Sequence, residues 1–240
     1  MRKSLIAALA VAFLAISASP SAASPLPQPR GWVAQIGTLA YLTTPNYSGL
    51  APISMATSQA TLGVGTFNHL SGELILVDGV LFRVSINGRP SVVPATRTTP
   101  FIQAIKFRPQ LSLRIPAGTA CADLLPIIDD AVGTTSGVVA LRVEGSFRRL
   151  QTRSVEGQSE PYPPFPDVVA QQTLFTLDGL AATLVGFRSG PDLAGLSPVG
   201  VHLHGVTSDL QAGGHVVSCV AGKGVKIQLQ VTKGIRVLGS

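Results

Sequence analysis

The stretch that decides the fold runs from Val199 to Val217 and reads VGVHLHGVTSDLQAGGHVV. It holds three of the four histidines of the chain, His202, His204 and His215. Apolar and other residues alternate around the first two, as they do in a strand, so both imidazoles point to one face about 6.6 Å apart. A turn-prone segment with Asp209 and two glycines follows, and His215 then opens a second apolar run. We predict a β-hairpin that brings His215 back beside the first two histidines.

Three neutral imidazoles that converge, with a fourth position left open, form the ligand set of a catalytic zinc ion. A single His-x-His pair in a strand is more often a pair of surface or hydrogen-bonded histidines. The concentration of His202, His204 and His215 in one strand–turn–strand stretch favours the metal site, and we predict that they bind Zn²⁺. Cys219 is a weaker candidate ligand, because its spacing places it two pleats beyond His215 on the same strand.

Residues 1–23 have the pattern of a secretory signal peptide. Arg2 and Lys3 form a basic start, an apolar run covers residues 5–16, and small residues occupy the cleavage positions 21–23. The apolar run is too short to span a membrane, and no later stretch of the sequence is long and apolar enough to do so. We predict an exported protein, periplasmic or extracellular, that does not cross the membrane.

The charge balance excludes one class of partner and fits another. Without Arg2 and Lys3, the 18 basic residues become 16 against 12 acidic ones, so the net charge falls from +6 to +4. No basic run exceeds two residues and aromatic residues are sparse, which argues against nucleic-acid binding. A mildly positive surface suits a small anionic substrate.

The chain has two cysteines, Cys121 and Cys219. Export permits a disulfide between them, but the sequence does not show that they lie close together. Two buried free thiols are an equally good interpretation at this point.

Strand patterns dominate the first half of the chain. Residues 72–84 predict two strands around a tight turn at Asp78-Gly79, and Asn87-Gly88 predicts a second tight turn before a third short strand. The glycines at positions 63 and 65 lack the third glycine of a dinucleotide-binding motif, and no phosphate-binding loop with Gly-Lys-Ser/Thr follows. We therefore exclude nucleotide binding.

Helices are few, and one Pro-rich segment divides the chain. The best helix pattern covers residues 119–132, with Thr119 as a cap and Pro126 as a residue that kinks or shortens it. A strand is predicted at residues 138–147, and the prolines of residues 158–166 exclude regular structure there. We predict an α+β (mixed α/β) fold on mixed and antiparallel sheets, with subdomains at residues 24–155 and 156–240.

Short motifs along the chain together resemble the α-acetolactate decarboxylase family over most of residues 33–217. The motifs, in order, are GTFNHL at 65–70, GELI at 72–75, TPF at 99–101, Arg153 followed by EPYPP at 160–164, LVGFR at 184–188, HLH at 202–204 and GGHV at 213–216. The resemblance implies a homodimeric two-domain α/β fold and a mononuclear zinc site. It also implies the conversion of 2-acetolactate to acetoin and carbon dioxide.

The resemblance assigns roles to individual residues. The zinc ligands of the family fall on His202, His204 and His215, its active-site glutamate on Glu73 and its active-site arginine on Arg153. The resemblance implies that Arg153 holds the substrate carboxylate, that Glu73 moves protons, and that Thr66 binds substrate through its hydroxyl group. The residues alone would not single out Arg153, because Arg148 and Arg149 are close by and most arginines lie on the surface.

The chain departs from the family pattern at three places, and the first is the poorly matching segment at residues 51–62. Gly205 stands where the family usually carries a bulky apolar residue, and no acidic residue follows Asp209, whereas family members often have a glutamate in a C-terminal tail that reaches the active site. A non-decarboxylating zinc- or ligand-binding protein on the same scaffold therefore remains the alternative. A zinc hydrolase is disfavoured, because no glutamate base adjoins the histidine pair as in His-Glu-x-x-His.

Overall fold

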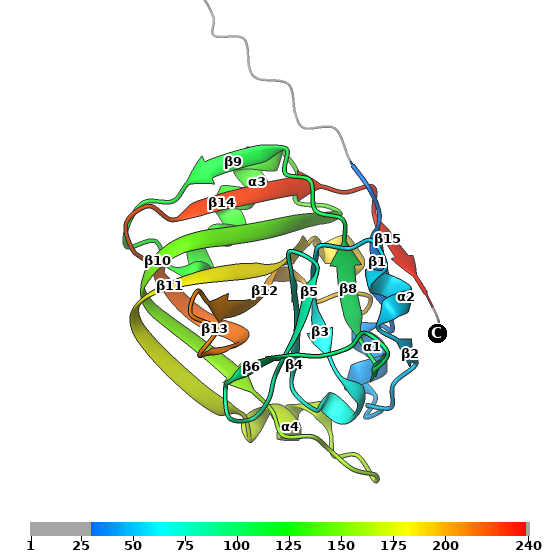
Figure 1. Ribbon diagram of the computed structural model, residues 1–240. Helices are drawn as coiled ribbons and strands as arrows, with labels where there is room; N and C mark the ends of the chain where they lie inside the picture. The colour runs from blue at the N-terminus through cyan, green and yellow to red at the C-terminus, as the bar shows by residue number, and fades with distance from the viewer. Residues whose placement is uncertain (1–29, 239–240) are drawn as a thin grey trace, which may run out of the picture.

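A computed structural model describes residues 30–238 of the chain (Figure 1). The predicted signal peptide, residues 1–23, lies outside the described residues. Within the part of the chain that the structure describes, no helix combines the length and the apolar character that a membrane crossing requires. The predicted fold class, strand-rich with few helices and with antiparallel and mixed sheets, is confirmed.

A seven-stranded sheet is formed by six strands from residues 33–105 and one from the end of the chain. Its neighbouring strands are antiparallel except for the parallel pair at one edge, β15 and β1. In spatial order the strands are β15 (Ile235–Val237), β1 (Val33–Ile36), β8 (Ile102–Ile105), β3 (Leu62–Thr66), β4 (Glu73–Val77), β5 (Val80–Val84) and β6 (Pro90–Val92). The β4–β5 hairpin turns at Asp78 and Gly79, whose φ angles of 52° and 81° are those of a tight hairpin turn. The second turn connects β5 to β6, with Val84 opposite Pro90 and Gly88 at φ of 76°, so both predicted turns are confirmed.

The second sheet has six strands and carries the histidine hairpin. In spatial order they are β11 (Thr173–Ser189), β12 (Gly200–Thr207), β13 (Gly213–Ala221), β10 (Val138–Ser154), β14 (Lys226–Val231) and β9 (Leu111–Arg114). Strands β10 and β11 also pair with each other, from Val138 opposite Ser189 to Ser154 opposite Thr173. Strands β10, β11, β12 and β13 thus close a ring, and Figure 1 shows β10 and β11 as two long curved arrows.

Strand β10 is longer than predicted, because it continues past Phe147 to Ser154. The polar residues at 148, 149 and 151 look like a loop in the sequence, but they belong to a strand with one solvent-facing side. Gly145, with φ of 143°, lets the strand bend against Val225, whose Cα would lie 2.8 Å from an added Cβ. The extension matters because it carries Arg153 into the sheet.

The helices are short. They are α1 (Leu39–Thr43), α2 (Ser54–Thr57), α3 (Leu124–Val132) and α4 (Phe165–Ala170), with 3₁₀ turns η1 (Asn68–Leu70), η2 (Cys121–Asp123) and η3 (Pro191–Leu193) and a small sheet of β2 (Ala51–Pro52) and β7 (Thr98–Thr99). The predicted helix at 119–132 starts later, and Thr119 does not cap it, because its hydroxyl donates to Pro116 O. Pro126 lies in the first turn of α3, where a backbone N–H has no partner to lose.

Apolar side chains fill two layers around the second sheet. One cluster joins the two sheets, with Val64, Ile75 and Phe187 among its members. Another packs α3 against the opposite face of the six-stranded sheet, through Ile128 and Leu141. The sheets do not follow the boundary at residue 155: β9 and β10, which precede it, pair with later strands, and β15 pairs with β1. As a division into folding units, the predicted subdomains stay a prediction.

Cys121 and Cys219 form a disulfide, with their Cα atoms 5.0 Å apart. The bond ties η2, just before α3, to strand β13. Gln151 and Thr152 are adjacent on β10, but they pair with Ser218 and Val216 on β13. Val217, which lies between these two, therefore has no partner on β10. This bulge reverses the side-chain alternation, so Cys219 faces the apolar layer under α3 and not the side of His215. The weaker prediction that Cys219 is a metal ligand was therefore wrong.

Candidate metal centre and active site

The predicted histidine hairpin is present as β12 and β13. His204 lies directly opposite His215 in the ladder, and His215 lies directly opposite Arg153 on β10. Side chains of directly opposite residues share a face of the sheet, so these three form one row across three strands. His202 is two residues before His204 and lies on the same face. Backbone pairing alone thus brings the three predicted ligands together.

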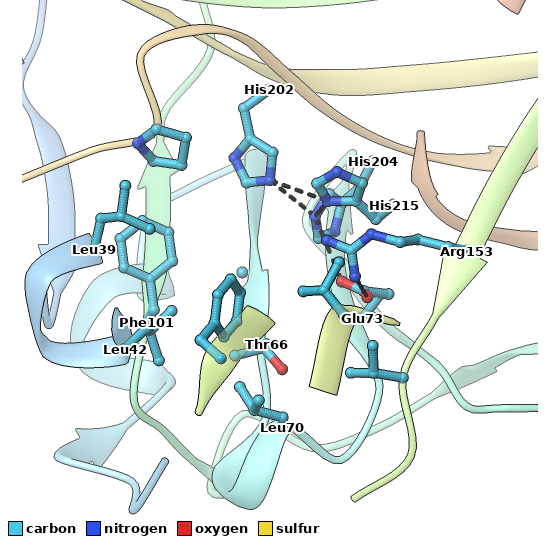
Figure 2. A pocket seen from close by; sticks show the side chains of 15 residues that line it. Leu39, Leu42, Thr66, Leu70, Glu73, Phe101, Arg153, His202, His204 and His215 are labelled. Carbon is cyan, nitrogen blue, oxygen red and sulfur yellow. Dashed lines mark hydrogen bonds and ion pairs between the residues drawn. The ribbon is translucent and has the colours of Figure 1, made fainter. Parts of the chain in front are cut away.

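The three imidazoles point one nitrogen each at a common centre (Figure 2). His202 Nε2 is 3.2 Å from His204 Nε2 and 3.3 Å from His215 Nδ1, and His204 Nε2 is 3.2 Å from His215 Nδ1. Nitrogens bound at 2.0–2.1 Å in a tetrahedral site are about 3.3–3.4 Å apart. The spacing therefore fits three ligands of one ion, and these histidines can hold a metal ion.

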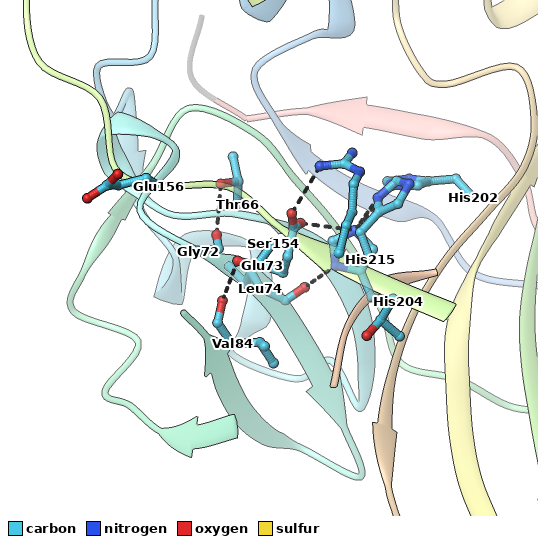
Figure 3. Close-up of polar contacts among 12 residues, drawn as sticks. Thr66, Gly72, Glu73, Leu74, Val84, Ser154, Glu156, His202, His204 and His215 are labelled. Carbon is cyan, nitrogen blue, oxygen red and sulfur yellow. Dashed lines mark hydrogen bonds and ion pairs between the residues drawn. The ribbon is translucent and has the colours of Figure 1, made fainter. Parts of the chain in front are cut away.

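The protonation of the cluster also fits a metal. His204 Nδ1 lies 3.0 Å from the carbonyl oxygen of Leu74, which can only accept a hydrogen bond, so the ring proton is on Nδ1 and Nε2 has a free lone pair (Figure 3). Burial, and then the charge of Arg153, lowers the pKa of His202 to about 4. The pKa values of His204 and His215 lie well below the ordinary value, first because of burial. Three neutral imidazoles are what a cation requires.

Glu73 begins strand β4 and reaches the cluster from the other sheet. Its side chain is almost fully buried, with Oε1 3.3 Å from Arg153 Nη1 and Oε2 3.6 Å from His204 Nε2. Burial raises the pKa of Glu73 to about 7, although the charge of Arg153 acts in the opposite direction. Near neutral pH this carboxyl group can therefore both give and take a proton.

Thr66 ends strand β3 directly opposite Glu73. Its hydroxyl group donates a hydrogen bond to the carbonyl oxygen of Gly72 at 2.9 Å (Figure 3). Because the hydroxyl proton is already used, Thr66 can offer a ligand only an acceptor. Thr66, Glu73, Arg153 and the three histidines line one cavity of about 210 Å³, so the structure brings all six predicted site residues together.

The chain around Arg153 is fixed on both sides by buried hydroxyl groups. Thr152 Oγ1 donates to Gly213 O at 2.9 Å, and Ser154 Oγ donates to Val84 O at 3.1 Å. Gly214 has φ of 138°, and a Cβ at this position would lie 2.5 Å from Arg153 O. A glycine beside His215 is thus required for the close approach of β13 to β10.

The opposite wall of the cavity is apolar, and the sequence alone did not reveal it. It is formed by residues of α1, η1, α4 and nearby loops: Leu39, Leu42, Leu70, Phe101, Val155, Phe165, Val169 and Pro198. Figure 2 shows Leu39, Leu42 and Phe101 on the side away from His204 and His215. No single spacing pattern connects these residues, because they come from two helices, a 3₁₀ turn and several loops that lie far apart in the sequence. The cavity therefore offers cation ligands and charged groups on one side and a hydrocarbon surface on the other.

The family model that this chain matches, two relatives in sequence and a solved structure that it resembles all carry the name alpha-acetolactate decarboxylase. The model of the alpha-acetolactate decarboxylase family matches residues 33–238. The alpha-acetolactate decarboxylase of Methanosarcina mazei is 31% identical over 190 residues, which cover 79% of this chain and 66% of that protein, slightly less than two thirds. The protein of the same name from Bacillus subtilis strain 168 is 32% identical, over 80% of this chain and 76% of its own. The crystal structure of that Bacillus subtilis protein superposes with a TM-score of 0.82 at 29% identity, covering 87% of this chain and 88% of that chain.

Proposed function

Because the chain belongs to the α-acetolactate decarboxylase family, we propose that it decarboxylates 2-acetolactate to acetoin and carbon dioxide with one Zn²⁺ held by His202, His204 and His215. One observation carries this proposal: three neutral imidazole nitrogens, 3.2–3.3 Å apart, share a cavity with Glu73 and Arg153. The two charged groups supply what this reaction needs beside a metal, a cation for the substrate carboxylate and a proton carrier.

His202, His204 and His215 would hold the Zn²⁺ ion, which would supply a Lewis acid for the substrate oxygens. Arg153 binds the substrate carboxylate through its planar guanidinium group and orients the carbon–carbon bond that breaks. Its position is defined by the ladder to His215 and by the hydroxyl groups on either side of it. The substrate therefore meets a cation whose orientation is fixed before binding.

Glu73 moves the protons. As a carboxylate it accepts the proton of the substrate hydroxyl group, and as a carboxylic acid it returns this proton to the carbon that has lost carbon dioxide. The overall reaction takes up one further proton, which comes from water and restores the hydroxyl group of acetoin. A pKa of about 7 makes both forms available near neutral pH. Thr66 accepts a hydrogen bond from a substrate or water hydroxyl group, since its own proton is bound to Gly72 O.

We propose further that the protein acts outside the cytoplasm as a homodimer. The disulfide between Cys121 and Cys219 supports an oxidising compartment, which agrees with the signal-peptide pattern of residues 1–23. The homodimer rests on the family resemblance. A small anionic molecule is the expected ligand, since Arg153 is the basic side chain that lines the cavity.

A second candidate function is metal or ligand binding without decarboxylation. The observation that favours it concerns residues 30–238: among them, Glu73 is the only carboxylate that lines the cavity. A site with one carboxylate has one proton carrier for two proton transfers, so a slow or absent reaction would point to a binding protein.

The experiment that tests the proposal uses the full mature chain. Its zinc content is measured, and acetoin is followed after mixing with racemic 2-acetolactate. We expect about one zinc per chain and rapid acetoin formation that a chelator stops and added Zn²⁺ restores. If zinc is bound but acetoin forms only at the background rate, binding without decarboxylation becomes the better supported function. Activity that persists after complete removal of metal would contradict the zinc mechanism.

A further inference from the structure

The apolar wall of the cavity depends on a segment that no sheet holds. Residues 155–172 connect β10 to β11 and contain only the short helix α4, which gives Phe165 and Val169 to the wall. One backbone hydrogen bond, from Gln158 N to His69 O at 2.7 Å, ties this segment to η1. The position of Phe165 must therefore be set largely by side chains.

Aromatic side chains provide the first part of that support. The Tyr47 ring is fully buried, and its hydroxyl group donates to Pro163 O at 2.8 Å. The ring centroid of Tyr47 lies 4.9 Å from that of Tyr162 and 6.4 Å from that of Phe165. Tyr47 thus sits between Tyr162 and the cavity residue Phe165, and these rings form one small core with Leu70.

The hydroxyl group of Tyr162 provides the second part. It is 2.5 Å from His69 Nδ1 and 3.0 Å from Ser48 Oγ. His69 and the cavity residue Leu70 have φ angles of 61° and 55°, which are unfavourable for residues with a side chain. Such a turn persists only where its surroundings hold it. Tyr162 therefore joins the two parts of the wall, α4 and the strained turn that presents Leu70.

The substrate class makes this wall important. In a 2-hydroxy-3-oxo acid all the oxygens lie on three adjacent carbons, so the metal ligands, Glu73 and Arg153 receive that side of the molecule. The alkyl groups then face the apolar wall. A pocket that fits one alkyl group rejects a group one methylene longer by about 10–200-fold.

We propose that Tyr162 is a positioning residue that, through His69 and Tyr47, seats Phe165 and Leu70 against the alkyl group at C2 of the substrate and so sets the preference for a methyl group. This inference rests on the proposed function for the identity of the substrate. Tyr162 does not line the cavity itself, so its effect on selectivity must pass through the residues that do.

The test compares 2-hydroxy-2-methyl-3-oxobutanoate with its 2-ethyl homologue. Tyr162→Phe removes the contacts of the hydroxyl group with His69 and Ser48, so it should raise KM for the methyl substrate and lower the methyl preference, each by about two- to ten-fold. The value of kcat should be nearly unchanged, because the groups of the polar side stay in place. Phe165→Ala should lower the preference further, and Tyr162→Phe should add nothing to Phe165→Ala. Thr57→Val is the control, because the Thr57 hydroxyl group donates to Ile53 O at 3.1 Å in α2, which gives no residue to the cavity, and this variant should behave as the parent protein. Zinc content should be equal in all variants.

A second measurement keeps the inference independent of turnover. Calorimetry on the zinc-loaded protein compares the unreactive 2,3-dihydroxy-2-methylbutanoate with its 2-ethyl homologue, and Tyr162→Phe should reduce the ratio of their Kd values. A parent protein that turns over neither substrate would refute the proposed function, and the binding ratio would still decide this inference. A Tyr162→Phe variant with parental KM and parental ratios, full additivity with Phe165→Ala, or no binding of either analogue would overturn it.

Discussion

The polar and apolar halves of the cavity are built in different ways. The polar half stands on strands: His204, His215 and Arg153 occupy directly paired positions on β12, β13 and β10, and Glu73 and Thr66 are paired on β4 and β3. The apolar half stands on short helices, 3₁₀ turns and loops that side chains hold in place. Backbone ladders thus fix the groups that we propose to bind a metal and move protons.

The difference suggests a division of labour. A change in the polar half should affect metal binding or the chemical step, because strand pairing sets the geometry of these groups. A change in the apolar half should affect KM and selectivity. The predictions below test this division, and the largest effects are expected in the polar half.

The largest effect is expected for His204→Ala. It removes a nearly fully buried ligand that Leu74 O orients, so metal affinity should fall by more than the 10–100-fold typical of a lost orienting group, and activity should be abolished. Metal analysis and acetoin formation measure both effects. His69→Ala is the matched control, since His69 lies outside the three-histidine group and that variant should keep its zinc. Full activity in metal-free His204→Ala would contradict the claim that the polar half binds a metal needed for the reaction.

Glu73→Gln should lower kcat by about 10²–10⁴-fold, the usual range for a lost proton carrier, while zinc stays bound. The amide has the shape of the carboxyl group but does not carry protons at neutral pH. Steady-state kinetics together with zinc analysis check the prediction. If kcat stays within a factor of a few of the parent value, another group carries the proton.

Arg153→Ala should retain zinc and lower kcat/KM by about 10²–10³-fold, the range for loss of one group that stabilises charge in a buried site. The surface residue Arg149 is the matched control, because it lies on the same strand and pairs with the exposed Asp178. Arg149→Ala should have parental kinetics. Loss of zinc in Arg153→Ala would show that the guanidinium group supports the metal site and not the substrate.

Replacement of both cysteines by alanine should leave kcat/KM unchanged and lower the free energy of unfolding by about 2–5 kcal/mol. Cys219 faces the apolar layer under α3, on the side of β13 opposite His215. The disulfide therefore stabilises the hairpin without touching the cavity. Denaturant unfolding measured beside kinetics tests this. A loss of zinc affinity at unchanged temperature and pH would show that the strand pairing alone does not hold His215.

The smallest expected effect concerns the pH dependence of stability in the metal-free protein. The pKa of Glu73 is raised from 4.5 to about 7 on folding, so the folded state holds this proton more tightly, and the contribution is present below pH 4.5 and lost as pH rises through 7. The free energy of unfolding of Glu73→Gln, relative to that of the parent, should therefore rise by about 2–3 kcal/mol from pH 5 to pH 8. Denaturant unfolding at the two pH values measures it, with Val169→Ala as a pH-independent control from the apolar half. A flat difference for Glu73→Gln would mean that its carboxyl group ionises normally.

Local sequence signals predicted the strand-borne half of the site well. The alternation around His202 and His204 and the glycines before His215 were enough to predict three candidate ligands on one hairpin. In a strand, residues two positions apart point to the same face, so the spacing alone predicts the orientation of the side chains. The turns at Asp78-Gly79 and Asn87-Gly88 were equally local. Glu73 and Arg153 needed the family resemblance, since their meeting depends on two sheets packing together, which no local pattern encodes.

Other features were beyond local signals for distinct physical reasons. Strand β10 was predicted to end at Phe147, because its second half has the polar composition of a loop and gains its structure from pairing with β11 and β13. The bulge at Val217, which turns Cys219 away from His215, depends on the register of a partner strand. The apolar wall was missed because Leu42, Phe101 and Phe165 become neighbours only in the folded chain.

The disulfide should keep the two parts of the chain joined if a protease cuts the peptide between the cysteines. Cys121 and Cys219 are 98 positions apart, and the exposed residues near Glu156 and Glu160 lie between them in sequence. Such exposed positions are where extracellular proteases cut. A single cut there would separate Arg153 from the three histidines along the peptide chain, yet both pieces would stay covalently joined. The nicked protein should migrate as one band on a non-reducing gel and as two after reduction.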